Sequence, residues 1–210
     1  MISSIGKTIL PVKIGRPLRL IVHASPLFNL GETAKPEIEY ILNTSSIKGK
    51  VLEIMDGVYT SYLDLPNRQR VWASAGFISD QLFKERPEFK SQTYILMGGN
   101  FISCLKTTWR CIIDHKLWGG QKPVIFHFPL KAIYMSKSPT ADILNRINPY
   151  YENPLENRGI TYSSFLDGQV RTSTLQPNRK SAVLLYFWSE SEDMFKAFGL
   201  LPLFRFHCNL

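Results

Sequence analysis

The chain has 210 residues, 44% of them hydrophobic and 12% aromatic, which excludes a disordered basic tail and suits a folded core. Lys and Arg number 25 against 17 Asp and Glu, so the formal charge of +8 favours polyanionic partners. No apolar run reaches about 18 residues, which argues against a membrane span, and the N-terminal sequence lacks the pattern of a secretory signal. We therefore predict a cytoplasmic protein with no membrane partner.

Apolar and β-branched residues predict two strands at the start of the chain, at 7–14 and 17–24. A short helix is expected near 37–42, because Pro36 suits a first helical turn. A second short helix is expected within FISDQLFKERPEF, where Pro87 ends it.

Two stretches, 50–65 and 160–175, are β-prone on both sides of an Asp-Gly pair, at 56–57 and 167–168 respectively. Asp-Gly favours the positive φ angles of a tight hairpin turn. The two stretches therefore predict two β-hairpins, and with them a sheet that is mainly antiparallel.

The clearest helical period runs from about Phe101 to Leu117, with Asn100 as the N-cap and the glycine pair at 119–120 as the C-terminal stop. One face of this helix is apolar and the opposite face is polar. The apolar face, which includes Trp109, is expected to pack into the core.

A strand at PVIFHFPLKAIYM and a short helix at SPTADILNRINPYY are expected next. The last thirty residues predict a ferredoxin-like strand–helix–strand unit that ends in a strand at 203–208. The predicted fold is α+β, with a mainly antiparallel sheet, two Asp-Gly hairpins, one long amphipathic helix and the helices on one side. We assign 1–210 to a single domain, with two lobes at about 1–95 and 96–210 as the alternative.

Cys104, Cys111 and His115 share one flank of the long helix, an arrangement that invites a zinc site. Residues seven apart on a helix are separated by about 10 Å along its axis, too far for both thiolates to share one ion. We predict no metal and no other cofactor. Because Cys208 makes the cysteine count odd, we expect reduced thiols.

The sequence offers no recognised catalytic motif. It lacks a GxSxG elbow, and His23, His127 and His207 lie in apolar strands where a core role is expected. The MGGN segment before the long helix either holds one phosphate on its free amides or forms a plain turn. We predict no catalytic residue, with a small enzyme that uses His127 or His207 as an alternative.

The basic residues are concentrated in one part of the sequence. From Lys106 to Arg146 there are seven basic and two acidic residues, with aromatic rings among them. Further cations follow Pro-Asn loop signals, so they are expected to be exposed. The predicted nucleic-acid-binding residues are Lys106, Arg110, Lys116, Trp118, Lys122, Arg68, Arg70, Arg179 and Lys180.

The segment PLRLIVHASPLFNLGETAKPEIEYIL, followed by VYTSYLDL and VWASAGF, resembles the opening of the Cas5-type RNA-binding subunits of CRISPR effector complexes. The resemblance covers about a third of the chain and implies a ferredoxin-like strand, a short helix and a hairpin. The glycine-rich loop of that family is absent near the C-terminus, where LPLFRFHCNL predicts a strand instead. No site residue is carried over from this resemblance.

We expect a non-catalytic basic subunit that binds nucleic acid, RNA rather than DNA, together with other protein subunits in a ribonucleoprotein or defence-type assembly. Cationic side chains would contact backbone phosphates, and Trp118 would stack on a base. A structural or protein-interaction subunit of a phage or secretion-type assembly is the second hypothesis, and the histidine enzyme is the third.

Overall fold

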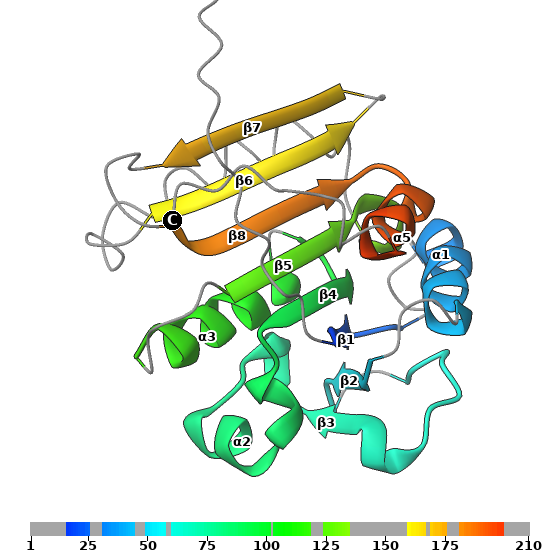
Figure 1. The fold of residues 1–210 in the computed structure, drawn as a ribbon. Coiled ribbons are helices and arrows are strands. Elements are labelled where there is room, and N and C mark those ends of the chain that lie inside the picture. The colour runs from blue at the N-terminus through cyan, green and yellow to red at the C-terminus, as the bar shows by residue number, and fades with distance from the viewer. Residues whose placement is uncertain are drawn as a thin grey trace, which may run out of the picture.

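The structure, a computed structural model, describes residues 16–25, 31–44, 49–57, 60–101, 103–118, 124–134, 159–166, 169–175 and 181–199. Its strands are β1 (Leu18–Val22), β2 (Val51–Met55), β3 (Arg70–Trp72), β4 (Thr93–Gly98), β5 (Val124–Pro129), β6 (Gly159–Leu166), β7 (Gln169–Leu175) and β8 (Ser181–Trp188). They form one sheet in the order β3-β2-β1-β4-β5-β8-β6-β7 (Figure 1).

The helices are α1 (Gly31–Asn43), α2 (Asp80–Glu85), α3 (Cys104–Trp118) and α5 (Ser191–Gly199). Short 3-10 turns connect several elements: η1 (Asn67–Gln69), η2 (Ser74–Gly76), η3 (Pro87–Lys90) and η4 (Leu130–Ala132). None of the helices in the described ranges is long and apolar enough to cross a membrane.

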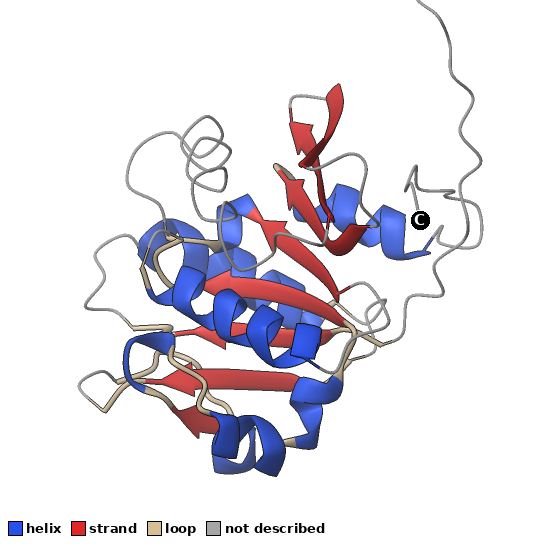
Figure 2. Cartoon of the chain, turned by 90° about the vertical axis from the view of Figure 1, so that its left-hand side faces the viewer, coloured by secondary structure: helices blue, strands red, loops and turns tan. Residues whose placement is uncertain are grey.

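Helices cover both faces of the sheet (Figures 1 and 2). On one face, Leu105 and Trp109 of α3 pack against alternate strand residues such as Leu20 and Phe126. On the other face, α1 and α5 pack against the residues that point the opposite way, such as Ile21. The predicted apolar side of the long helix is confirmed, and the prediction that the helices lie on one side is wrong.

The predicted mainly antiparallel sheet is also wrong, because six of the seven strand pairings are parallel. β1, β4 and β5 are buried on both faces along their whole length. Strands covered on both faces read as continuous apolar runs, and such runs are typical of parallel sheets in α/β proteins. The chain is therefore an α/β protein rather than an α+β protein.

The two Asp-Gly stretches have different outcomes. The hairpin at 50–65 is wrong, because β2 pairs in parallel with both β1 and β3. The hairpin at 160–175 is confirmed by the antiparallel pairing of β6 with β7, although its turn at 167–168 lies outside the described residues. An Asp-Gly pair favours a tight turn locally, but the partner of a strand is decided by burial across the whole sheet.

The ferredoxin-like expectation for the start of the chain is wrong, and the third strand of the unit expected at the C-terminus lies outside the described residues. β1, α1 and β2 form a parallel crossover unit instead of the strand, helix and hairpin implied by the Cas5-type resemblance. At the other end, β8 lies between β5 and β6 and is parallel to both. The strands predicted at 7–14 and 203–208 and the helix predicted at SPTADILNRINPYY lie outside the described residues.

His127 lies on β5 inside the α1 and α5 face, where it is 2% exposed. Its ring stacks on Tyr186, and its Nδ1 accepts a hydrogen bond from Trp188 Nε1 at 3.1 Å. Burial lowers the pKa of His127 to about 3, so the ring is neutral in the folded protein at ordinary pH. This geometry gives His127 a packing role.

We predict that acid destabilises the protein through His127. Between pH of about 6.5 and about 3 the unfolded chain binds a proton at this position that the folded chain does not. The free energy of unfolding therefore falls by about 1.4 kcal/mol for each unit by which the pH is lowered in this range. Urea unfolding at pH about 7 and about 5 measures the slope. His127→Asn keeps an acceptor for Trp188 and cannot titrate, so its slope should be smaller; an equal slope contradicts the assignment.

Candidate functional site

The order of the strands defines a switch point between β1 and β4. From β1 the chain runs outward through β2 to β3, then returns to the other side of β1 as β4. Val22 and Gly98 are register partners, so the two strands end side by side. In open α/β sheets, ligands bind outside the carboxyl ends of the strands at such a point.

Cys104 begins α3 at this carboxyl edge, after a turn at Gly98, the last residue of β4, and Gly99. Its Sγ accepts a hydrogen bond from the backbone N–H of Asn100 at 3.3 Å. A Cβ added to Gly99 would lie 3.0 Å from that sulfur, and one added to Gly98 would lie 2.6 Å from the Val22 carbonyl oxygen. The glycine pair therefore lets the chain turn sharply and places the thiol against the end of β1.

Left-handed backbone is concentrated at the same edge. His23, directly after β1, has a φ of 47°, and Ala75 in η2 has a φ of 50°. For residues with a Cβ such a conformation costs about 1–2 kcal/mol, and it persists where surrounding contacts enforce it. The positive-φ residues of the described chain are His23, Ala75, Gly76, Gly98 and Gly99.

The η2 turn joins the ends of β1, β2 and β3 to α3. Ala75 donates its backbone N–H to Asp56 Oδ2 at 2.9 Å, and His23 Nε2 lies 3.4 Å from the Ala73 carbonyl oxygen. On the other side, Thr108 Oγ1 of α3 donates to the Gly76 carbonyl at 2.9 Å. A thiol, an imidazole and a carboxylate from three different segments are thus gathered around one turn.

The Asp56 carboxylate acts electrostatically on each of the other two groups. Burial lowers the pKa of His23, while the Ala73 carbonyl and the Asp56 carboxylate act in the opposite direction. Burial raises the pKa of the Cys104 thiol, against the effect of backbone N–H groups of Asn100, Leu105 and Cys104 itself, and the Asp56 charge raises it further. At neutral pH burial therefore favours a protonated Cys104 thiol and a neutral His23 imidazole.

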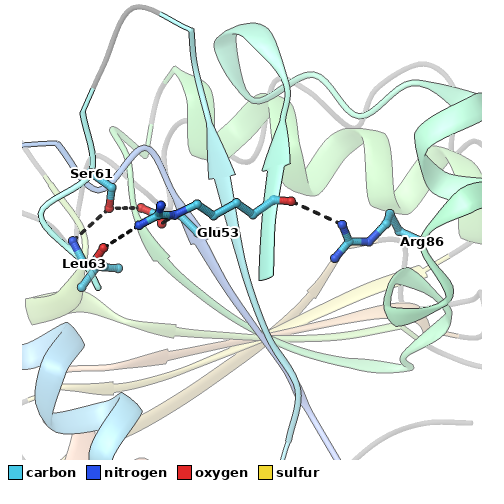
Figure 3. A network of polar contacts seen from close by, with 5 residues as sticks. Glu53, Ser61, Leu63 and Arg86 are labelled. Atoms are coloured by element: carbon cyan, nitrogen blue, oxygen red, sulfur yellow. Dashed lines mark hydrogen bonds and ion pairs between the residues drawn. The ribbon is translucent and has the colours of Figure 1, made fainter. Parts of the chain in front are cut away.

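A buried polar network holds the neighbouring segments in place (Figure 3). Glu53 of β2 is fully buried, accepts a hydrogen bond from Ser61 Oγ, and lies 3.4 Å from Arg70 Nε. Arg70 also donates to the Leu63 carbonyl at 2.8 Å, and Arg86 donates to the Arg70 carbonyl at 3.3 Å. The network attaches the 61–63 segment and the edge strand β3, which leads into η2, to the sheet.

The predicted nucleic-acid-binding residues lie in several separate parts of the structure. Arg110 is exposed and Lys106 partly exposed on the outer side of α3, one turn apart. Lys116, farther along α3, is half-buried with its Nζ 6.0 Å from the centre of the Phe83 ring. The structure therefore places Lys106 and Arg110 on one side of α3, and Lys116 separately against the Phe83 ring of α2.

The other predicted residues are elsewhere. Arg68 is exposed in η1, and its carbonyl accepts a hydrogen bond from Arg86 at 2.8 Å. Arg70 forms an ion pair with Glu53 within the buried network. Lys122, Arg179 and Lys180 lie outside the described residues, as does the side chain of Trp118.

Sequence reasoning missed the grouping of Cys104, His23 and Asp56. It treated His23 as part of a strand, Asp56 as a hairpin turn and Cys104 as a rejected zinc ligand. The signal that could have found the group is a parallel-sheet pattern: an apolar strand, a glycine pair, and a cysteine in the first turn of a helix. Within the described chain, no group of three or more His, Cys, Asp and Glu residues could hold a metal ion.

Comparison with known proteins adds no assignment: no family model, no curated protein and no solved structure matches the chain.

Proposed function

We propose that the chain is a thiol-dependent acyl-transfer enzyme whose nucleophile is Cys104. The observation that supports the proposal is the position of its sulfur in the first turn of α3, at the switch point, with Asp56 and His23 around the adjoining η2 turn. A thiol needs a base for activation, and a carboxylate near the imidazole favours the imidazolium that forms. The substrate class is an activated acyl compound, an ester or a thioester.

In the proposed reaction, His23 accepts the thiol proton and the sulfur attacks the carbonyl carbon. The bond to the leaving alcohol or thiol breaks, the leaving group takes the proton from His23, and a thioester to Cys104 remains. Water then hydrolyses the thioester, which restores the thiol and releases a carboxylic acid. Backbone N–H groups at the start of α3 would stabilise the negative charge that develops on the carbonyl oxygen.

The test is to trap the thioester. The full chain is incubated with p-nitrophenyl acetate, quenched in acid, digested and analysed by mass spectrometry. We expect one acetyl group on the peptide that contains Cys104, and a burst of nitrophenol equal to the enzyme concentration. Acetylation spread over lysines, with no burst, would contradict the proposal.

Nucleic-acid binding is the second candidate function, and it is favoured by Lys106 and Arg110, which lie one turn apart on the outer side of α3. Each phosphate contact releases counterions, so affinity should fall steeply with salt and depend little on sequence. RNA is the ligand that we propose for this surface.

The α3 surface is tested with the double variant Lys106→Gln/Arg110→Gln. We expect it to bind single-stranded RNA at least about tenfold more weakly in a fluorescence anisotropy titration, and to lower the salt slope by about two units. The matched control, Lys35→Gln/Lys196→Gln, removes two charges from α1 and α5, on the opposite face. Equal affinity in the two double variants would rule out contacts through α3.

A further inference from the structure

A concave region lies at the amino edge of the sheet, the edge opposite to Cys104. It is an open pocket of about 770 Å³ between the start of β1, the end of α1 and η3. Its lining includes four cationic residues, Arg16, Arg19, Lys50 and Lys90, and one carboxylate, Glu88. Pockets of this volume accommodate small organic ligands.

In the part of the chain that the structure describes, most of the positive charge of this pocket is not paired with a carboxylate. Among the described residues, Arg16, Lys50 and Lys90 form no ion pair. Glu88 is already paired, because its Oε2 lies 3.4 Å from Arg86 Nε. Within the described ranges, three of the cations that line the pocket therefore have no carboxylate partner.

Arg19 adds a buried cation to the wall of the pocket. It is 9% exposed, and its guanidinium donates to the Leu42 carbonyl at 2.9 Å and to the Gly49 carbonyl at 3.0 Å. These bonds fix the guanidinium against the last turn of α1. Its Nε has no hydrogen-bond partner in the described part of the chain.

Like charges also meet beside the pocket. Lys90 lies close enough to Lys116 to act on it, and burial together with this repulsion lowers the pKa of Lys116 to about 8. An anion held between these cations would relieve the repulsion. The charge of the region thus favours an anionic ligand over a neutral one.

We propose that the amino-edge pocket binds a phosphoryl group. Phosphate accepts several charge-assisted hydrogen bonds at once, which matches guanidinium and ammonium donors on different sides of one cavity. The pocket has room for more than inorganic phosphate, so the ligand class that we propose is a phosphate ester. The phosphoryl group has two sources, a free phosphomonoester and the backbone of RNA. This inference is independent of the thiol chemistry at the opposite edge.

The test uses isothermal titration of the full chain with inorganic phosphate, adenosine 5′-monophosphate and a single-stranded RNA oligomer that lacks terminal phosphates. We expect saturable binding of the monophosphate, and displacement of it by inorganic phosphate. Arg16→Gln/Lys50→Gln should weaken binding at least about tenfold, whereas Lys84→Gln/Lys196→Gln, which removes two exposed charges outside the pocket, should not change it.

The arms of the experiment separate the two sources. If the RNA oligomer displaces the monophosphate from wild type and itself binds Arg16→Gln/Lys50→Gln more weakly than wild type, the backbone is the source. If the oligomer does not displace the monophosphate, a free ester is the ligand. The proposal is overturned if no phosphate compound binds saturably, or if both double variants bind equally. Melting temperatures of the variants equal to wild type exclude loss of folding as the cause.

Discussion

Replacing Cys104 by serine is expected to lower the hydrolysis of p-nitrophenyl acetate at least about a hundredfold while the circular dichroism spectrum stays unchanged. The hydroxyl of serine fits the space beside Gly99, but it is a far weaker nucleophile at this position. The measurement is the steady-state rate at neutral pH, together with the amplitude of the nitrophenol burst. Both should vanish in the variant.

Cys111→Ser is the matched control, because Cys111 is a second buried cysteine on the same helix. Its rate should equal that of wild type. His23→Asn separates a catalytic role from a structural one, since it should flatten the acidic limb of the pH–rate profile. In wild type that limb should lie below pH of about 6.5, because burial lowers the pKa of His23. An equal loss of hydrolysis rate in Cys104→Ser and Cys111→Ser would contradict the assignment of Cys104 as the nucleophile.

Replacing Arg70 by methionine is expected to lower the free energy of unfolding by about 3 kcal/mol at neutral pH, because it leaves Glu53 buried without its cationic partner. Burial already raises the pKa of Glu53, and Ser61 and Arg70 act against that rise. Without Arg70 the pKa rises further. Urea unfolding at neutral pH measures the loss.

The loss should depend on pH in a defined direction. When the folded-state pKa of Glu53 lies above its unfolded value, the folded chain binds the extra proton, so stability decreases as pH rises above about 4.5. Arg70→Met should therefore cost less near pH of about 5 than at neutral pH. The double variant Glu53→Gln/Arg70→Met removes the buried charge and should recover most of the stability. Without such recovery, the loss must come from packing alone.

The positions of several elements could be predicted from sequence. Ser79 caps α2 and Pro87 follows its end, and the apolar period of α3 identified its buried face. The partners of the strands could not be predicted, since β1 pairs with β4 across seventy residues of intervening chain. Local propensity indicates the conformation of a single segment. Parallel pairing instead joins strands that are distant in sequence, because a crossover connection must lie between them.

The candidate site was hidden for the same reason. His23, Asp56 and Cys104 are ordinary residues when each is considered alone, and only the switch point brings them around η2. By contrast, the cations of α3 were visible in the sequence, because residues one turn apart on a helix need no tertiary information to be placed together. The role of Arg70 was not visible, since its partner Glu53 lies on a different strand.

The strand order also has a consequence for synthesis of the chain. β3, β2, β1, β4 and β5 all come from residues 18–129, so this five-stranded half can assemble while later residues are still being translated. Until residues 181–188 emerge, the backbone of β5 is an uncovered edge that can pair with another nascent chain. β8 therefore acts as the covering strand of this fold, and messages truncated before it should yield a product prone to self-association.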